Sequence, residues 1–208
     1  NIEAYDLALR GRSLVYGLTP ENIAEATTLF ERSIELDPNF VAGYWGLAIS
    51  LFIDHLNDWN DATEQVLETG FRTAEKAVEI DPSDPEAHWA CALSKLWRRD
   101  LDGAVSAIDK AVSVGPNHAE VLATRGYILT HASRADESIE CLEKAMRLDP
   151  HFPAIWLHFL GHAYVVHGDY QQAATILKRR ILRQPETDTS RALLVSCYGH
   201  LGLTSEAR

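Results

Sequence analysis

Apolar residues recur along this chain with the spacing of an α-helix. In the segment FERSIELDP, Phe30 is followed by Ser33 and Ile34 at offsets of three and four residues. The segments 108–116 and 142–150 repeat that spacing. Offsets of three and four place side chains on one helical face. No alternating pattern of comparable strength is present, so the sequence predicts an all-α protein.

The helix ending is repeated five times. FERSIELDP is followed by AEKAVEIDP at 74–82, IDKAVSVGP at 108–116, LEKAMRLDP at 142–150 and LKRRILRQP at 177–185. The residue before a proline avoids helical geometry, so each copy is expected to end a helix. The intervals between successive prolines are 44, 34, 34 and 35 residues. The units are therefore predicted to end near Pro38, Pro82, Pro116, Pro150 and Pro185, with a truncated sixth unit at 186–208.

Each interval offers two helices joined by a short turn. The turns at 98–104, 133–138 and 167–173 are rich in Gly, Asp and Ser, which stop and start helices. About ten extra residues fall within 54–70, so the second helix of that unit is expected to be longer. Self-similarity at this period is typical of stacked helical repeats.

The units resemble the tetratricopeptide repeat (TPR) family, whose pattern is W-x2-L-G-x2-Y, then A-x3-F, then P. The second half of the pattern is the clearer one. It is matched by Ala26, Phe30 and Pro38, by Ala104, Ile108 and Pro116, and by Ala173, Leu177 and Pro185. The resemblance covers nearly the whole chain. It implies one domain over 1–208, a right-handed superhelical solenoid of antiparallel helix pairs that binds proteins and is not an enzyme.

The opening segment resembles a narrower group. Tyr5, Leu9 and Gly11, with Asp-Pro-Asn at 37–39, look like the repeat region of bacterial multidomain signalling proteins. In that group a class III nucleotide cyclase domain or a winged-helix DNA-binding domain precedes such repeats. The resemblance implies an interaction or regulatory module, and we expect both ends of the chain to be cuts within a longer protein. The alternative is the sensory or assembly tail of an adenylate cyclase in cAMP signalling, or of a winged-helix transcription regulator.

The TPR resemblance implies that the first helix of each pair lines a concave surface. Projecting that rule selects these residues for partner binding: Trp45, Ile49, Phe52, Trp89, Leu93, Trp97, Tyr127, His131, Leu157 and His158. Exposed aromatic clusters mark interaction surfaces. The expected partner is a protein or peptide segment, its own parent domain or a second copy. The alternative is that several rings fill the core between repeats, as expected for Trp156.

The projected positions disfavour one ligand class. Some TPR domains grip acidic C-terminal tails with Lys and Asn, whereas the positions here carry Trp, Leu, Ala and His. The chain itself is acidic, with 30 Asp and Glu against 19 Lys and Arg, a net charge of −11. Nucleic-acid binding needs a basic surface and is therefore not expected. The local exception is Lys178, Arg179, Arg180 and Arg183, interpreted as a solvated face or an anchor for an acidic neighbour.

The remaining features indicate a cytoplasmic protein. No apolar run approaches the roughly 20 residues that span a bilayer, and no signal peptide is visible. Three widely spaced cysteines without a CxxC pair fit a reducing compartment.

Metal binding and catalysis find little support. His158 and His162 have i, i+4 spacing, which can hold zinc, but HFLGH lacks the glutamate of HExxH. Glycine-rich phosphate loops and GxSxG motifs are absent from the sequence. We therefore expect no cofactor and no enzymatic activity in this fragment.

Overall fold

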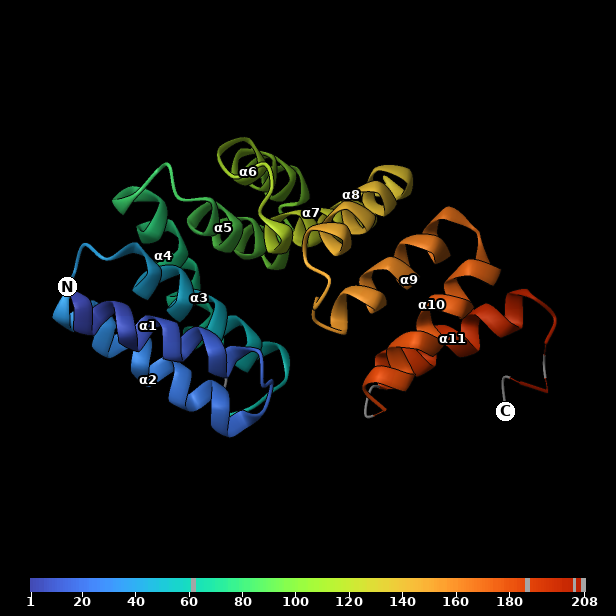
Figure 1. The fold of residues 1–208 in the computed structure, drawn as a ribbon, viewed down its shortest axis with the longest axis horizontal. Helices are drawn as coiled ribbons and strands as arrows, with labels where there is room; N and C mark the ends of the chain where they lie inside the picture. The colour runs from blue at the N-terminus through green and yellow to red at the C-terminus, as the bar shows by residue number, and fades with distance from the viewer. Residues whose placement is uncertain (61–62, 186–187, 204, 207–208) are drawn as a thin grey trace. The chain divides into compact units, whose positions relative to one another are not determined.

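The computed structural model of the chain describes residues 1–60, 63–185, 188–203 and 205–206. Regular structure in these ranges is entirely helical, which confirms the predicted all-α class. The chain divides into two compact units, Asn1–Gly115 and Pro116–Arg208, and each is described by itself (Figure 1). Whether both belong to one solenoid domain over 1–208 stays a prediction.

The first unit contains three helix pairs, in which each helix packs on its successor. Their helices are α1 (Ile2–Val15), α2 (Pro20–Leu36), α3 (Val41–Leu56), α4 (Glu64–Ile80), α5 (Pro85–Trp97) and α6 (Leu101–Val114). The helix α4 has 17 residues, against 14 in α6, so part of the insertion lengthens the second helix as expected. Residues 61–62, also within the insertion, lie outside the described ranges.

The second unit contains two helix pairs and one further helix. These are α7 (Ala119–His131), α8 (Ala135–Leu148), α9 (Ile155–His167), α10 (Tyr170–Arg183) and α11 (Asp188–His200). The helix α11 packs mainly on α10, in the place that the first helix of a sixth repeat would take. Figure 1 shows α9, α10 and α11 following one another in orange to red.

The prolines end the second helices by the predicted mechanism. The last residue before the proline has extended backbone angles at Asp37 (φ −148°, ψ 90°), Asp81 (φ −138°, ψ 95°) and Asp149 (φ −122°, ψ 97°). In each case the aspartate Oδ1 also accepts a hydrogen bond from the backbone N–H two residues later, at 2.9–3.2 Å. This short-range bond satisfies a turn amide and fixes the direction in which the chain leaves the helix.

Several helices begin at a side-chain cap. Asp84 accepts a hydrogen bond from Ala87 N–H, Asp100 from Gly103 N–H and Asp169 from Gln172 N–H. Such caps satisfy backbone donors that the first helical turn leaves unpaired. The turns between paired helices can therefore stay short, which keeps partners antiparallel and adjacent.

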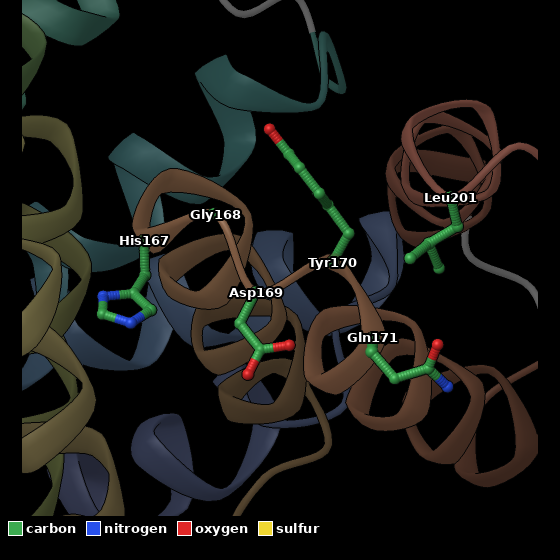
Figure 2. A pocket seen from close by; sticks show the side chains of 6 residues that line it. All are labelled: His167, Gly168, Asp169, Tyr170, Gln171 and Leu201. Carbon is green, nitrogen blue, oxygen red and sulfur yellow. The ribbon is translucent and has the colours of Figure 1, made fainter.

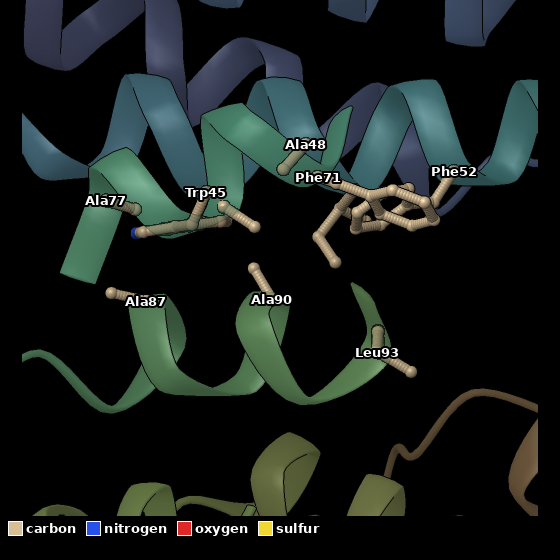
Figure 3. Packing of buried hydrophobic residues seen from close by; sticks show 10 residues of the cluster. Trp45, Ala48, Phe52, Phe71, Ala77, Ala87, Ala90 and Leu93 are labelled. Carbon is tan, nitrogen blue, oxygen red and sulfur yellow. The ribbon is translucent and has the colours of Figure 1, made fainter. Parts of the chain in front are cut away.

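Within each unit, the core lies between the two helices of each pair and between neighbouring pairs. The large residues of the TPR pattern on the second helices, Phe30, Ile108 and Leu177, are completely buried. In the first unit, Figure 3 shows α5 facing α3 and α4 across a layer of small and aromatic side chains that includes Ala48, Ala87 and Ala90. Alanine at these positions lets neighbouring helices approach closely and leaves room for the rings beside them.

Candidate interaction surface

Two tryptophans of α5 lie at the edge of the first-unit core. Trp89 and Trp97 are half-buried, so part of each indole remains accessible. Trp97 packs edge-on against Phe52, with ring centroids 4.6 Å apart at 74°, and Trp89 packs edge-on against Trp45, at 6.3 Å and 60°. These arrangements are favourable for aromatic pairs and hold both indoles in place.

The projected exposure of four other residues is wrong. Trp45, Ile49, Phe52 and Leu93 are buried, and Phe52 is inaccessible to water. All four belong to the cluster formed where α3, α4 and α5 meet (Figure 3). The first helices of adjacent repeats pack on one another, so residues on their shared side are core. Trp89 and Trp97 lie where this packing ends.

Charged groups border the tryptophan layer. The Arg12 guanidinium lies 5.5 Å from the centre of the Trp45 ring and 2.8 Å from Glu86 Oε1. A cation above an indole face is attracted by the ring quadrupole. Arg12 of α1 therefore covers one side of the Trp45 ring, and its ion pair with Glu86 of α5 holds the guanidinium in that position.

The second unit carries a row of rings from α7 and α9. Tyr127 lies 4.5 Å from Phe159 and 4.6 Å from His131, and His131 lies 5.5 Å from His162, between ring centroids. His131 is exposed, and the other three are half-buried. The structure thus brings the predicted residues Tyr127 and His131 together and adds Phe159 and His162.

His158 lies deeper in the same unit. Its Nδ1 atom is 2.9 Å from Ser190 Oγ of α11. Burial, then the positive charges of His162 and Arg180, lower the pKa of His158 from 6.5 to about 4. The imidazole is consequently neutral at pH 7 and acts as a hydrogen-bonding group that links α9 to α11. Leu157, also projected onto the groove, is completely buried, as is Trp156 at 1% exposure.

Within the described part of the chain, the histidine pair has no third ligand for a metal ion. The His158 and His162 rings are 6.4 Å apart between centroids. Among the residues that the structure describes, no group of three or more His, Cys, Asp and Glu side chains is arranged to hold a metal ion. The contact with the His131 ring places His162 in the row of rings from α7 and α9. Burial and then the positive charge of His131 lower the pKa of His162.

Arg180 departs from the sequence interpretation. The sequence predicts a solvated face or an anchor for an acidic neighbour in the basic segment, and Lys178, Arg179 and Arg183 are exposed. Arg180 is only 4% exposed. The signal for its burial is the repeat itself, because Arg180 occupies the position that is Ala111 and Ala145 in other units.

A separate open depression of about 390 Å³ lies near the end of the second unit. His167, Gly168, Asp169, Tyr170, Gln171 and Leu201 line it, as Figure 2 shows. Tyr170 stacks on His200 at 4.1 Å, and His167 Nδ1 lies 2.8 Å from Asp136 Oδ1. His167 and Tyr170 thus make ordinary surface contacts at this rim, and Asp169 caps α10.

Comparison with models of protein families shows which family the chain belongs to. Two family models described as tetratricopeptide repeat match residues 89–151 and 129–197, which together span 89–197. The chain belongs to the tetratricopeptide repeat family. TPR repeats form a non-catalytic scaffold and indicate a protein–protein interaction module.

One solved TPR structure and two curated proteins are similar to this chain. The thermophilic TPR protein TTC0263 from Thermus thermophilus is similar in structure, with a TM-score of 0.70 over 93% of this chain and 98% of that protein, at 18% identity. The putative adenylate cyclase 3 of Rhizobium meliloti (strain 1021) is 35% identical over 105 residues, 50% of this chain and 18% of that protein. The transcriptional regulator HilA of Salmonella typhimurium is 24% identical over 153 residues, 72% of this chain and 27% of that protein. The chain thus spans less than a third of each of these two curated relatives.

The TPR helices of this chain are short. Among the described residues, none of the helices combines the length and the apolar character needed to cross a bilayer. The longest, α2 and α4, have 17 residues each and carry charged side chains on their outer faces.

Proposed function

We propose that this chain is the interaction and regulatory module of a larger bacterial signalling protein. It binds a partner segment or a neighbouring domain through the first helices of its TPR pairs. The contact residues are Trp89 and Trp97 in the first unit and Tyr127, His131 and His158 in the second. Its proposed location is the cytoplasm, in keeping with three free cysteines at Cys91, Cys141 and Cys197.

One observation carries this proposal. Trp89 and Trp97 are only half-buried although they adjoin a core that accommodates Trp45 and Phe52. Water-accessible indole surface contributes roughly 25 cal/mol per Å² when a partner covers it. Large rings held in fixed orientations are typical anchors of binding surfaces. Ring surface of this kind fits an amphipathic helix or an extended apolar segment.

Site-specific crosslinking tests the proposal. A photoreactive phenylalanine analogue replaces Trp97 in the full-length protein, and a matched variant carries it at Arg72, an exposed residue on α4. We expect a discrete crosslinked product from position 97, whose peptides map to one segment of the parent protein, a second copy or another protein. Identical patterns from both positions, or no product from position 97, would contradict the proposal.

A second candidate concerns the parent protein. Identity of 35% over 105 residues with a putative adenylate cyclase favours a cyclase tail over other bacterial signalling proteins. The weaker similarity to HilA supports a transcription regulator instead. The full-length protein is assayed for conversion of ATP to cyclic AMP and for binding of promoter DNA. Formation of cyclic AMP would identify the parent as a cyclase, and DNA binding would identify it as a transcription regulator. If the full-length protein shows neither activity, both candidates are rejected.

A further inference from the structure

The side of α1 that faces away from the core of the first unit is apolar. Five of the eleven large apolar residues that are exposed in the described chain fall between residues 2 and 18. Four of them follow one another at offsets of three, four and seven residues: Ile2 (90% exposed), Tyr5 (54%), Leu9 (47%) and Tyr16 (49%). Such offsets place side chains on one side of a helix, and Tyr16, which caps α1, still has helical backbone angles. These four residues form one exposed row, which we call the α1 stripe, and exposed apolar rows mark interaction surfaces.

The opposite side of α1 is occupied by the core of the first unit. Ala4 and Ala8 are buried there, and a β-carbon at Gly11 would lie 2.9 Å from the Phe30 ring of α2. The helix α1 packs on α2 and, over a smaller area, on α3 (Figure 1). The α1 stripe lies about half a helical turn away from these contacts, so the fold of the first unit leaves it accessible.

The α1 stripe is arranged symmetrically about Leu9. Ile2 precedes Leu9 by seven residues, and Tyr16 follows it by seven. Tyr5 precedes Leu9 by four residues, and the residue four positions after it is Ser13, which is exposed and small. In an antiparallel pair of α1 helices centred on Leu9, the Tyr5 ring of each copy therefore lies over Ser13 of the other. A large side chain facing a small one lets two helices approach closely.

Two charged residues beside the α1 stripe are also complementary between antiparallel copies. Asp6 and Arg10 are exposed, lie on the same side of α1, and make no ion pair with another described residue. This side of the stripe is the one away from Arg12, which covers the Trp45 ring. A two-fold axis at Leu9 brings this side of one helix against the same side of the other, with Asp6 of each copy beside Arg10 of its mate. Parallel pairing would instead bring this side against the one that carries Arg12.

We propose that two copies of this chain associate through the α1 stripe as an antiparallel, two-fold symmetric helix pair. Such a contact uses the same surface on both copies, so it closes as a dimer and does not propagate. The helix α1 has 14 residues and is about 21 Å long, so the contact falls at the small end of specific interfaces and the dimer is reversible. The α1 stripe lies on a different helix from Trp89 and Trp97, and the inference therefore goes beyond the proposed function.

Sedimentation velocity of the 208-residue chain tests the proposal by measuring the dissociation constant of the dimer. Concentrations up to about 0.5 mM are used, because contacts of this size are weak. The variant Leu9→Glu places two like charges at the two-fold axis. Leu182→Glu is the matched control, at an 84% exposed leucine of α10. Thermal unfolding verifies that each variant folds.

We expect a monomer–dimer equilibrium in the wild type and in Leu182→Glu. In Leu9→Glu the dissociation constant rises by about tenfold or more, because like charges facing each other across an interface repel. A wild type that stays monomeric over this range overturns the proposal and leaves the α1 stripe to another part of the full-length protein or to a different protein. Equal dimerisation in the wild type and Leu9→Glu, or an equal loss in Leu182→Glu, also overturns it.

Charge reversal tests the antiparallel arrangement and does not depend on Leu9. Asp6→Arg places an arginine beside Arg10 of the other copy at two sites in the dimer, and we expect the dissociation constant to rise by about threefold or more. The double variant D6R/R10D exchanges the two charges, so its dissociation constant should return close to that of the wild type. Unchanged dimerisation in Asp6→Arg, or no recovery in D6R/R10D, overturns the proposal. Crosslinking from position 97 does not involve α1, so it tests the proposed function independently.

Discussion

Leu142 of α8 packs directly against the backbone of α7 at Gly126. A β-carbon at Gly126 would lie 2.6 Å from Leu142 Cγ and 3.1 Å from the backbone oxygen of Ser138. The next pair repeats this contact, where a β-carbon at Gly161 would lie 2.7 Å from Leu177 Cγ. In both pairs, the glycine of the first helix sets how closely the second helix approaches.

We therefore expect Gly126→Ala to destabilise the protein. Alanine forces either Leu142 or the α8 backbone to move, and overpacking of this kind costs about 1–3 kcal/mol. The free energy of unfolding is measured by urea denaturation. Gly199→Ala is the control, because nothing lies within 4 Å of a β-carbon there. Gly199 lies in α11, so its replacement is expected to be neutral or to stabilise by up to about 1 kcal/mol. Equal losses at both sites would contradict the packing argument.

Stability is expected to fall as the pH drops from 6.5 to about 4. Burial, His162 and Arg180 lower the pKa of His158 to about 4, whereas the unfolded chain titrates this group near 6.5. Between these values the unfolded chain binds a proton that the folded chain does not, which favours unfolding as the pH falls. The pKa difference corresponds to about 3 kcal/mol at most.

The variant H158N isolates this contribution. Asparagine keeps a side chain able to hydrogen-bond Ser190 but does not titrate. Urea denaturation between pH 7 and pH 4 should give a shallower loss of stability in H158N than in the wild type. Parallel curves would show that His158 is not held neutral by its surroundings.

The repeat could be predicted from the sequence because each of its parts depends on local chemistry. Proline at a fixed interval ends a helix by a steric effect on its own neighbour, and Asp37 adopts the extended geometry predicted for the residue before Pro38. The A-x3-F positions likewise fall on one face of one helix, so Ala104 and Ile108 are both completely buried.

The exposure of ring side chains could not be predicted in the same way. Trp45 and Trp89 lie on the first helices of successive pairs, yet one is buried and the other half-buried. The difference arises from the packing of α3 on α5 and from Arg12 above the Trp45 ring, which join residues far apart in sequence. The burial of Arg180 likewise depends on the helices that pack on α10. The sequence did contain a signal for it, because the equivalent positions in other repeats carry Ala111 and Ala145.

Truncation of Phe30 should be among the most damaging single changes in the first unit. Phe30 is completely buried, and its ring lies 6.4 Å from that of Trp45. Phe30→Ala removes this burial and leaves a cavity, at a cost of about 3–5 kcal/mol. Leu182→Ala is the control, because Leu182 is 84% exposed and its loss should change the unfolding free energy by less than about 0.5 kcal/mol. A small loss of stability in Phe30→Ala would mean that the surrounding helices move together and fill the cavity, which would contradict this prediction.

Arg180→Met is expected to raise the thermal midpoint of the isolated chain. The guanidinium has two shielded nitrogens without acceptors among the described residues, so folding removes its hydration without replacing those hydrogen bonds. Methionine has a flexible, unbranched side chain that adapts to irregular space in a packed interior. Replacing a buried charged group by a packed apolar one is often neutral or stabilises by about 1–4 kcal/mol. Scanning calorimetry in chloride buffer measures the change, and Arg179→Met, at an exposed neighbouring site, should leave the midpoint nearly unchanged. A clear loss of stability in Arg180→Met alone would mean that the arginine already has an acceptor within the folded chain.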